Sequence, residues 1–288
     1  MSNKLAFLSC GLVGVALACG DGGAAFATPI LEASPNWSGY ADTLPADSGY
    51  TVSSVSGSWY VPTVQAPPGS SSAYSSIWVG IDGLNENALE QIGISANVVN
   101  GQTQYGAWYE MLPADPTSIP ITVPGAIPIR AGDLISASAS YNTSTKEFTL
   151  AISDLTAGNP DNFSITIAGS GQPRLTAEWI VEDPTVNGSL PTLADFGPVS
   201  FSGLGSVEGA GGLVASGPID SASNVGGTTY QLWMQQGGSA KAAPTPLADN
   251  GGVSSFTDVY VAEPSAAVLL ALGAAAYSLL HGARKRPH

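Results

Sequence analysis

The chain has 288 residues and a formal net charge of −14 at pH 7, with 22 acidic but only eight basic residues. Such a surface repels phosphate backbones, so a nucleic-acid partner is not expected. The basic residues between positions 28 and 262 are Arg130, Lys146, Arg174 and Lys241. This composition suits an acid environment, because most carboxylates become neutral below about pH 4 and their mutual repulsion then fades.

The first 27 residues have the layout of a secretory signal peptide. Lys4 precedes an apolar run from Leu5 to Ala18, and small residues lead up to Ala27. The apolar run is too short to span a bilayer, so we expect export and cleavage after Ala27. Cys19 follows a sequence that weakly resembles a lipoprotein cleavage box, which leaves lipidation of this cysteine as an alternative.

Residues 28–262 are of a size for one domain, in which short β-branched and aromatic runs alternate with turn residues. Examples in chain order are "GSWYVPTV", "SSIWVGID", "QYGAWYEML", "DLISASASY", "EFTLAISDL", "TAEWIVED", "TYQLWMQ" and "SFTDVYVA". Clusters of Gly, Pro, Ser, Asn and Asp separate these runs at short intervals. The pattern predicts an all-β domain, an antiparallel β-sandwich of two large stacked sheets.

Cysteine and histidine are absent from residues 28–262. Both cysteines, Cys10 and Cys19, lie in the leader, and both histidines, His281 and His288, lie in the C-terminal tail. This distribution excludes a disulfide, a thiol nucleophile, a Ser-His-Asp triad and a His-ligated zinc site from the domain.

The run "TAEWIVEDP" contains two glutamates four residues apart, Glu178 and Glu182. Successive side chains of a strand point to opposite faces, so Ala177, Trp179 and Val181 form one apolar face. The two glutamates share the other face, with their α-carbons roughly 13 Å apart at the rise of a strand. Strand parity alone does not decide whether either glutamate is catalytic.

Tryptophan and carboxylate side chains share a face in two further runs. Trp78 and Asp82 do so in "SIWVGID", and Trp108 and Glu110 do so in "GAWYEM". Such faces are common in concave grooves that bind polymers through aromatic platforms. Scattered surface carboxylates on strands with core tryptophans would give the same pattern, so the spacing leaves both interpretations open.

Six ordered blocks of the chain resemble the eqolisins, the glutamic peptidase family. The blocks are "NWSGY", "GSWYVPTV", "WVGIDG" followed by "ALEQIG", "YGAWYEMLP", "AEWIVED" and "FGPVSFSG", and the match runs from Asn36 to about Val261. The resemblance implies a concanavalin A-like sandwich of two seven-stranded antiparallel sheets. It also implies an endopeptidase that cleaves protein or peptide substrates in acid through a Gln-Glu dyad, without metal or cofactor.

Carried over by motif, the catalytic glutamine of the family falls on Gln91 and the catalytic glutamate on Glu182. An ionised glutamate can accept a proton from water and return it to the departing nitrogen. A carboxamide is a neutral hydrogen-bond donor suited to the oxyanion of a tetrahedral intermediate. The residues that match the substrate-binding groove of the family are Trp78, Asp82, Glu110 and Glu178.

Two other functions stay open at this stage. A laminarinase-like glycoside hydrolase also places two carboxylates four residues apart on one strand face, but it adds an acid midway, where this chain has Ile180. A non-catalytic surface protein or carbohydrate-binding sandwich would also present tryptophan-rich sheet faces. The presence of both Gln91 and Glu182 favours the peptidase over this second alternative.

Residues 263–288 form a distinct C-terminal segment. A Glu-Pro pair is followed by an apolar run from Ser265 to Leu280 and then by Arg284, Lys285 and Arg286. This order resembles the PEP-CTERM sorting signal of Gram-negative bacteria, which a membrane exosortase removes; a permanent tail anchor is the alternative. We therefore expect transient membrane association, followed by release as a secreted or cell-surface monomer.

Overall fold

The computed structural model describes residues 28–115, 117–121, 127–156, 161–210, 213–217, 226–249 and 253–262. These residues form 17 strands, and no helix occurs among them. Accordingly, no helix in the described ranges is long and apolar enough to cross a membrane. The expected leader and C-terminal tail, residues 1–27 and 263–288, lie outside the described residues.

Strand pairing defines a first sheet of seven main strands, listed here in spatial order. They are β1 (Ile30–Ser34), β14 (Thr228–Gln236), β2 (Trp37–Thr43), β11 (Thr176–Glu182), β4 (Ser76–Ile81), β5 (Leu89–Val99) and β6 (Gln102–Leu112). The short strand β7 (Ile119–Pro120) extends the edge beside β6. All of these pairs are antiparallel except β1 with β14, which is parallel. β11 and β4 therefore lie near the centre of the sheet.

The second sheet also has seven main strands. In spatial order they are β10 (Asp161–Ala168), β9 (Glu147–Asp154), β8 (Leu134–Asn142), β3 (Thr51–Tyr60), β12 (Pro198–Ala210), β17 (Ser254–Tyr260) and β15 (Ser239–Pro244). Two short strands, β13 (Leu213–Gly217) and β16 (Ala248–Asp249), pair with β12 and β17. β15 also pairs with β14, so one hairpin joins the hydrogen-bond ladders of the two sheets.

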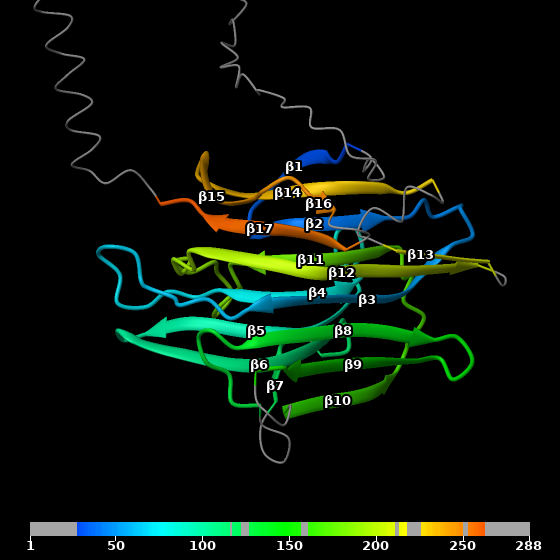
Figure 1. Ribbon diagram of the computed structural model, residues 1–288, viewed down its shortest axis with the longest axis horizontal. Coiled ribbons are helices and arrows are strands. Elements are labelled where there is room, and N and C mark those ends of the chain that lie inside the picture. Colours follow the sequence, from blue (N-terminus) through cyan, green and yellow to red (C-terminus); the bar gives the residue numbers. More distant parts are fainter. Residues whose placement is uncertain are drawn as a thin grey trace, which may run out of the picture.

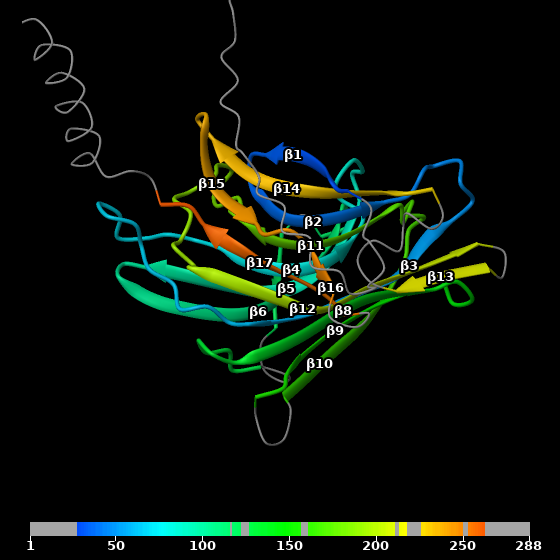
Figure 2. The ribbon, with the colours of Figure 1, turned by 45° about the horizontal axis from the view of Figure 1, so that its top comes forward.

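The two sheets stack as layers (Figures 1 and 2), with β3 and β8 of the second sheet against β4 and β5 of the first. The alternation of apolar and polar residues along the strands supplies the inner faces, because side chains alternate between the two sides of a strand. The predicted all-β sandwich of two seven-stranded sheets is confirmed. The parallel pairing of β1 is the one departure from a fully antiparallel arrangement in the described strands.

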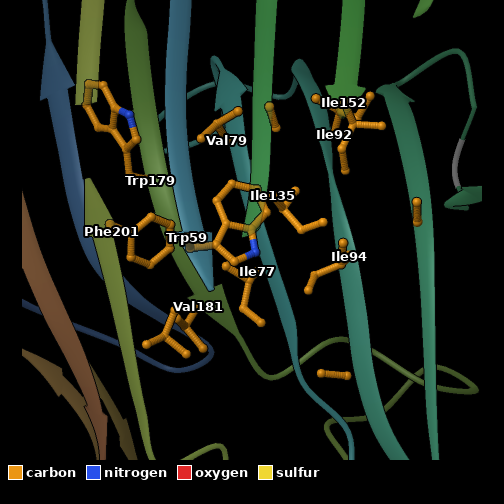
Figure 3. Packing of buried hydrophobic residues seen from close by; sticks show 14 of the residues in the cluster. Trp59, Ile77, Val79, Ile92, Ile94, Ile135, Ile152, Trp179, Val181 and Phe201 are labelled. Carbon is orange, nitrogen blue, oxygen red and sulfur yellow. The ribbon is translucent and has the colours of Figure 1, made fainter. Parts of the chain in front are cut away.

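The core lies between the layers and is rich in large aromatic and branched side chains. Figure 3 shows Trp59 and Trp179 directed into this space together with branched residues from both sheets. Ala177, Trp179 and Val181 of β11 are all fully buried there, as strand parity predicted. The Trp179 indole Nε1 donates a hydrogen bond of 2.7 Å to the Ser56 carbonyl oxygen of the opposite sheet. This packing orients the other face of β11, with both glutamates, away from the second sheet.

A glycine on β2 allows β11 to approach closely. Gly39 has a φ of +141°, and a Cβ atom built there would lie 2.1 Å from the Trp179 carbonyl oxygen. We expect Gly39→Ala to destabilise the fold by about 3 kcal/mol, because backbone of β2 or β11 would have to move. Thermal unfolding should show a midpoint lower by roughly 10 °C.

The matched control is Gly106→Ala on β6, where a Cβ atom meets only Ser95 Oγ at 3.5 Å. This variant should unfold close to the wild-type temperature. Equal midpoints for the two variants would show that the close approach of β2 to β11 does not require glycine.

Candidate active site

The outer face of the first sheet, the face turned away from the second sheet, carries the polar and aromatic residues singled out in the sequence. A small apolar cluster lies on this face, made of Ala41, Trp78, Leu89, Trp108, Ile180 and Leu232, with Trp37, Leu84, Leu112 and Tyr230 packed against it. It is separate from the core between the sheets. Carboxylate and carboxamide groups on this face are therefore embedded among aromatic and aliphatic side chains.

Glu182 ends β11 and is surrounded by hydrogen-bond donors from two neighbouring segments. Its Oε2 accepts a bond of 2.8 Å from the Trp78 indole Nε1 and a longer one of 3.5 Å from Ser76 Oγ. Its Oε1 accepts a bond of 3.1 Å from Asn36 Nδ2. Register explains these contacts, since Glu182 pairs with Ser76 on β4 and with Trp37 on β2. The residue as a whole is partly exposed, while both carboxyl oxygens are engaged by these donors.

The environment of Glu182 adjusts its proton affinity. The pKa of Glu182 is raised to about 7, chiefly by burial. The negative charge of Glu110 contributes to the rise, and hydrogen bonds from Trp78, Trp37 and Ser76 oppose it. Neutral donors stabilise the ionised form without adding positive charge. A carboxyl group with this pKa can exchange a proton in both directions at mildly acid pH, as a general acid-base group must.

Gln91 and Glu110 face each other on adjacent strands. They are register partners of β5 and β6, and Gln91 Nε2 donates a hydrogen bond of 2.5 Å to Glu110 Oε2. Gln91 is buried, and its Oε1 has no hydrogen-bond partner in the described part of the chain. Burial raises the pKa of Glu110 and the charge of Asp115 raises it too, while the bond from Gln91 lowers it.

Trp78 lies between the two predicted catalytic residues. β4 separates β5 from β11, and its residue Gly80 pairs with both Gln91 and Glu178. Trp78, two residues earlier on β4, is therefore in the row between Gln91 and Glu182 on the outer face. Its ring meets that of Trp37 edge-on, with centroids 5.0 Å apart. The two indoles pack together beside the Glu182 carboxyl group, and Trp78 is fully buried in this arrangement.

The structure separates Glu178 from Glu182 although they share a face. Glu178 is fully buried, whereas Glu182 is partly exposed. Burial raises the pKa of Glu178 well above its ordinary value, and the nearby charges of Asp82, Glu86 and Glu90 raise it further. Glu178 is thus an inaccessible group whose protonated form is favoured by burial in this conformation. Of the two glutamates, only Glu182 retains exposed side-chain area.

Asp82 also lies beneath the surface, where it binds backbone. Its two carboxyl oxygens accept hydrogen bonds of 2.7 and 2.8 Å from the backbone N–H groups of Leu175 and Arg174. Its φ of 65° turns the chain at the end of β4. Burial raises the pKa of Asp82 to about 6. In this conformation Asp82 connects the β4–β5 loop to the start of β11, and its predicted contact with substrate stays a prediction.

Sequence reasoning did not single out Asn36, Ser76 or Trp37, all of which hydrogen-bond or flank Glu182. Asn36 and Trp37 belong to the block "NWSGY", and Ser76 has the same strand parity as Trp78. The block and the parity could thus have indicated them. Among the described residues, no group of three or more His, Cys, Asp or Glu side chains is arranged to bind a metal ion.

Three comparisons with known proteins agree with this arrangement. The model of the peptidase A4 family matches residues 35–237. Aspergillopepsin-2 of Aspergillus niger is 33% identical over 210 residues, which cover 66% of this chain and 69% of that protein. The range matched by the family model, residues 35–237, includes β2, β4, β5, β6 and β11, which carry the outer-face side chains.

Solved structures show the same fold. The crystal structure of scytalido-glutamic peptidase with a transition state analog inhibitor matches with a TM-score of 0.58 and 25% identity, covering 79% of this chain and 98% of that chain. Aspergilloglutamic peptidase from Aspergillus niger matches with a TM-score of 0.50 and 32% identity, covering 66% and 99% of the two chains. The chain therefore belongs to the peptidase A4 family, the eqolisin group of glutamic endopeptidases.

Proposed function

We propose that the protein is an acid-acting endopeptidase in which Glu182 activates water and Gln91 stabilises the oxyanion. The observation that carries this proposal is the Glu182 carboxyl group, which lies on a partly exposed residue and is held by neutral donors at a pKa of about 7. Such a group can serve in turn as base and as acid. Family membership supplies the reaction class, and the assignment of the two residues is our inference from motif and geometry.

In the first step, ionised Glu182 accepts a proton from a water molecule as the water oxygen bonds to the carbonyl carbon of the substrate. The carbonyl π electrons move to its oxygen, which becomes the oxyanion. In the second step, this electron pair re-forms the carbonyl while the C–N bond breaks, and Glu182 returns its proton to the departing nitrogen. The products are a carboxylic acid and an amine, and Glu182 is again ionised.

Gln91 suits the oxyanion role because its carboxamide donates hydrogen bonds at any pH at which the enzyme works. It lies in an apolar part of the outer face, where a donor directed at developing charge is worth more than in water. One N–H of Gln91 Nε2 is held by Glu110. The second N–H is left for the substrate.

The remaining predicted site residues receive supporting roles. We assign Trp78, which is fully buried, the role of orienting the Glu182 carboxyl group through its indole Nε1. Glu110 lies close enough for its charge to raise the pKa of Glu182. Glu178 and Asp82 are buried beneath the face, so direct substrate contact by either would require the β4–β5 loop to move. A pocket of about 230 Å³ beside Asn36 and Trp37 could accept a substrate side chain.

Cleavage of casein by the purified protein between pH 2 and 8 tests the proposal. The ionised fraction of Glu182 grows toward pH 7, whereas ionisation of buried carboxyls such as Asp258 lowers the stability of the fold over the same range. These opposing effects place the expected maximum of activity on the acid side of neutrality. EDTA should leave cleavage unchanged because the proposed site uses no metal, and pepstatin should leave it unchanged because no aspartate pair is involved.

The two inhibitors act as controls against contaminating metallopeptidases and aspartic peptidases. Inhibition by EDTA or by pepstatin would show that the observed cleavage comes from another site or from a contaminating protein. Absence of cleavage over the whole pH range, in a protein that unfolds cooperatively, would favour the non-catalytic binding function.

The location of the protein is also a proposal. The leader-like residues 1–27 and the tail-like residues 263–288 support export, transient membrane association and exosortase processing in a Gram-negative bacterium, with release of a monomer. Mass spectrometry of the protein recovered from its host would show whether the chain begins at Thr28 and ends near Ala262. An intact C-terminal tail in the membrane fraction would instead support a permanent anchor.

A further inference from the structure

We infer that Glu110 is a positioning residue that holds the carboxamide of Gln91 in the orientation required for oxyanion stabilisation. The inference deepens the proposed function and rests on it. It replaces the expectation that Glu110 binds substrate directly. The inference rests on the 2.5 Å hydrogen bond that Gln91 Nε2 donates to Glu110 Oε2. The two residues lie opposite each other on the paired strands β5 and β6.

The four positions that surround Gln91 on the outer face leave Glu110 as its polar neighbour. Along β5 the same face presents Leu89 and Gly93, two residues to either side. Across the sheet, Gln91 pairs with Gly80 on β4 and with Glu110 on β6. Leucine and glycine side chains cannot hydrogen-bond, so Glu110 is the neighbour that can restrain the amide.

A larger residue that could take over this task meets backbone at Gly93 and tight side-chain contacts at Gly80. A Cβ atom at Gly93 would lie 2.2 Å from the Ile77 carbonyl oxygen and 2.5 Å from Trp78 Cβ. A Cβ atom at Gly80 would lie 3.0 to 3.2 Å from Leu89, Trp78 and Gln91. The sheet therefore provides glycines on two sides of the glutamine side chain, Leu89 on the third and a hydrogen-bond partner on the fourth.

Glu110 has few hydrogen-bond partners other than Gln91 among its neighbours in the sheet. Its same-face neighbours along β6 are Trp108 and Leu112, both in or against the apolar cluster. On its outer side, β7 pairs with Trp108 and Tyr109 and does not reach Glu110. A hydrogen bond between two polar groups in such surroundings is strengthened by the low local dielectric. The pair is thus expected to persist in the free enzyme.

Restraint of Gln91 matters because a flexible glutamine side chain must otherwise lose rotational freedom at each catalytic cycle. Bound to Glu110 through one N–H, the amide plane is set before substrate arrives and the second N–H keeps a fixed direction. A preorganised donor lowers the barrier of the chemical step more than it tightens substrate binding. A carboxylate that bound a charged group of the substrate would tighten substrate binding more than it lowered the barrier of the chemical step.

Two substitutions of similar size separate these roles. Glu110→Gln keeps a side-chain oxygen that accepts from Gln91 Nε2, whereas Glu110→Leu removes the acceptor. For a neutral peptide substrate, Glu110→Leu should lower kcat by about 100-fold with KM nearly unchanged. Glu110→Gln should retain kcat within about fivefold, because a neutral hydrogen bond is roughly half as strong as a charged one. Glu147→Leu on β9 of the second sheet is the control and should match the wild type.

The kinetic outcome overturns the inference if both variants raise KM equally at constant kcat, which is the signature of a substrate-binding carboxylate. It is also overturned if Glu110→Leu keeps wild-type kcat. Glu182→Gln is assayed in parallel, because wild-type activity in that variant would contradict the proposed function without bearing on the Gln91–Glu110 bond.

Nuclear magnetic resonance of the Gln91 side-chain amide tests the bond without any cleavage assay. The two proton signals, assigned by their loss in Gln91→Ala, should be widely separated in the wild type and in Glu110→Gln. They should move together toward the values of a solvent-exposed glutamine in Glu110→Leu. Averaged amide signals in the wild-type protein would overturn the inference whether or not the protein cleaves peptides.

Discussion

Replacing Glu182 by glutamine should lower kcat/KM for a peptide substrate by roughly 10³-fold or more, because a carboxamide cannot accept the proton of the attacking water. The substitution keeps an oxygen that can accept from the Trp78 indole Nε1 and adds no volume, so the fold should be retained. Activity is measured under single-substrate conditions at several pH values, and folding is measured by thermal unfolding of the same preparation. The loss should appear at every pH.

The matched control is Glu178→Gln, the same exchange four residues earlier on the same strand face. Glu178 is fully buried and its pKa is raised well above the usual value, so a neutral amide resembles the form that burial favours. This variant should keep activity within about threefold of the wild type, as expected for a residue that does not touch the reacting atoms. Loss of activity in Glu178→Gln together with its retention in Glu182→Gln would assign the catalytic role to the other glutamate.

The free energy of unfolding should fall steeply as the pH rises from about 4 toward 9, because several buried carboxyl groups hold their protons in the folded state. Burial raises the pKa of Asp258 from 3.8 to about 8 and that of Glu90 from 4.5 to about 9. Above about pH 4.5 the unfolded chain has released these protons while the folded chain retains them. The folded state thus binds more protons, and stability declines with pH until the folded pKa values are passed.

The size of this effect is large relative to the stability of an ordinary domain. One unit of pKa difference corresponds to about 1.4 kcal/mol. Asp183 and Asp82 are also raised, each from 3.8 to about 6, again chiefly by burial. Shifts of this size together reach or exceed the roughly 5–15 kcal/mol by which a domain is stable. We therefore expect the largest free energy of unfolding below about pH 4 and a markedly smaller one at and above neutrality.

Urea unfolding from pH 3 to pH 9 measures this dependence directly. In Asp258→Asn the stability should decline less between pH 4 and 8, since the titrating group is gone while Ser38 Oγ, 2.8 Å from Asp258 Oδ1, keeps an oxygen to donate to. Glu147→Gln, at a half-buried position on β9, should leave the slope as it is in the wild type. A wild-type stability that is constant or rises over this pH range would contradict the assignment of protonated buried carboxyls.

Much of the fold follows from local pattern. Alternation along "TAEWIVED" assigned Ala177, Trp179 and Val181 to the core, and the structure buries all three. The ordered blocks predicted two seven-stranded sheets, which strand pairing confirms. Such predictions succeed because side-chain direction in a strand depends only on residue number and because apolar faces must be covered.

The candidate site depended more on contacts between distant parts of the chain. Strand parity placed Glu178 and Glu182 on one face but could not predict how deeply each side chain is buried. That burial depends on which other residues pack over each position. Asp82 shared a face with Trp78 in the sequence, yet it turns inward to bind the backbone of Arg174 and Leu175, more than 90 residues away. Asn36 reaches Glu182 across 146 positions of the chain.

By itself, the sequence determined the all-β class, the core face of β11 and the lack of cysteine and histidine in the domain. It also carried the resemblance that predicts catalytic roles for Gln91 and Glu182. The tertiary structure alone decided that Glu182 is accessible and Glu178 is not, and that Gln91 is held by Glu110. The physical reason is that alternation along a strand is a local property, whereas burial, pKa and cross-strand hydrogen bonds depend on which strands become neighbours.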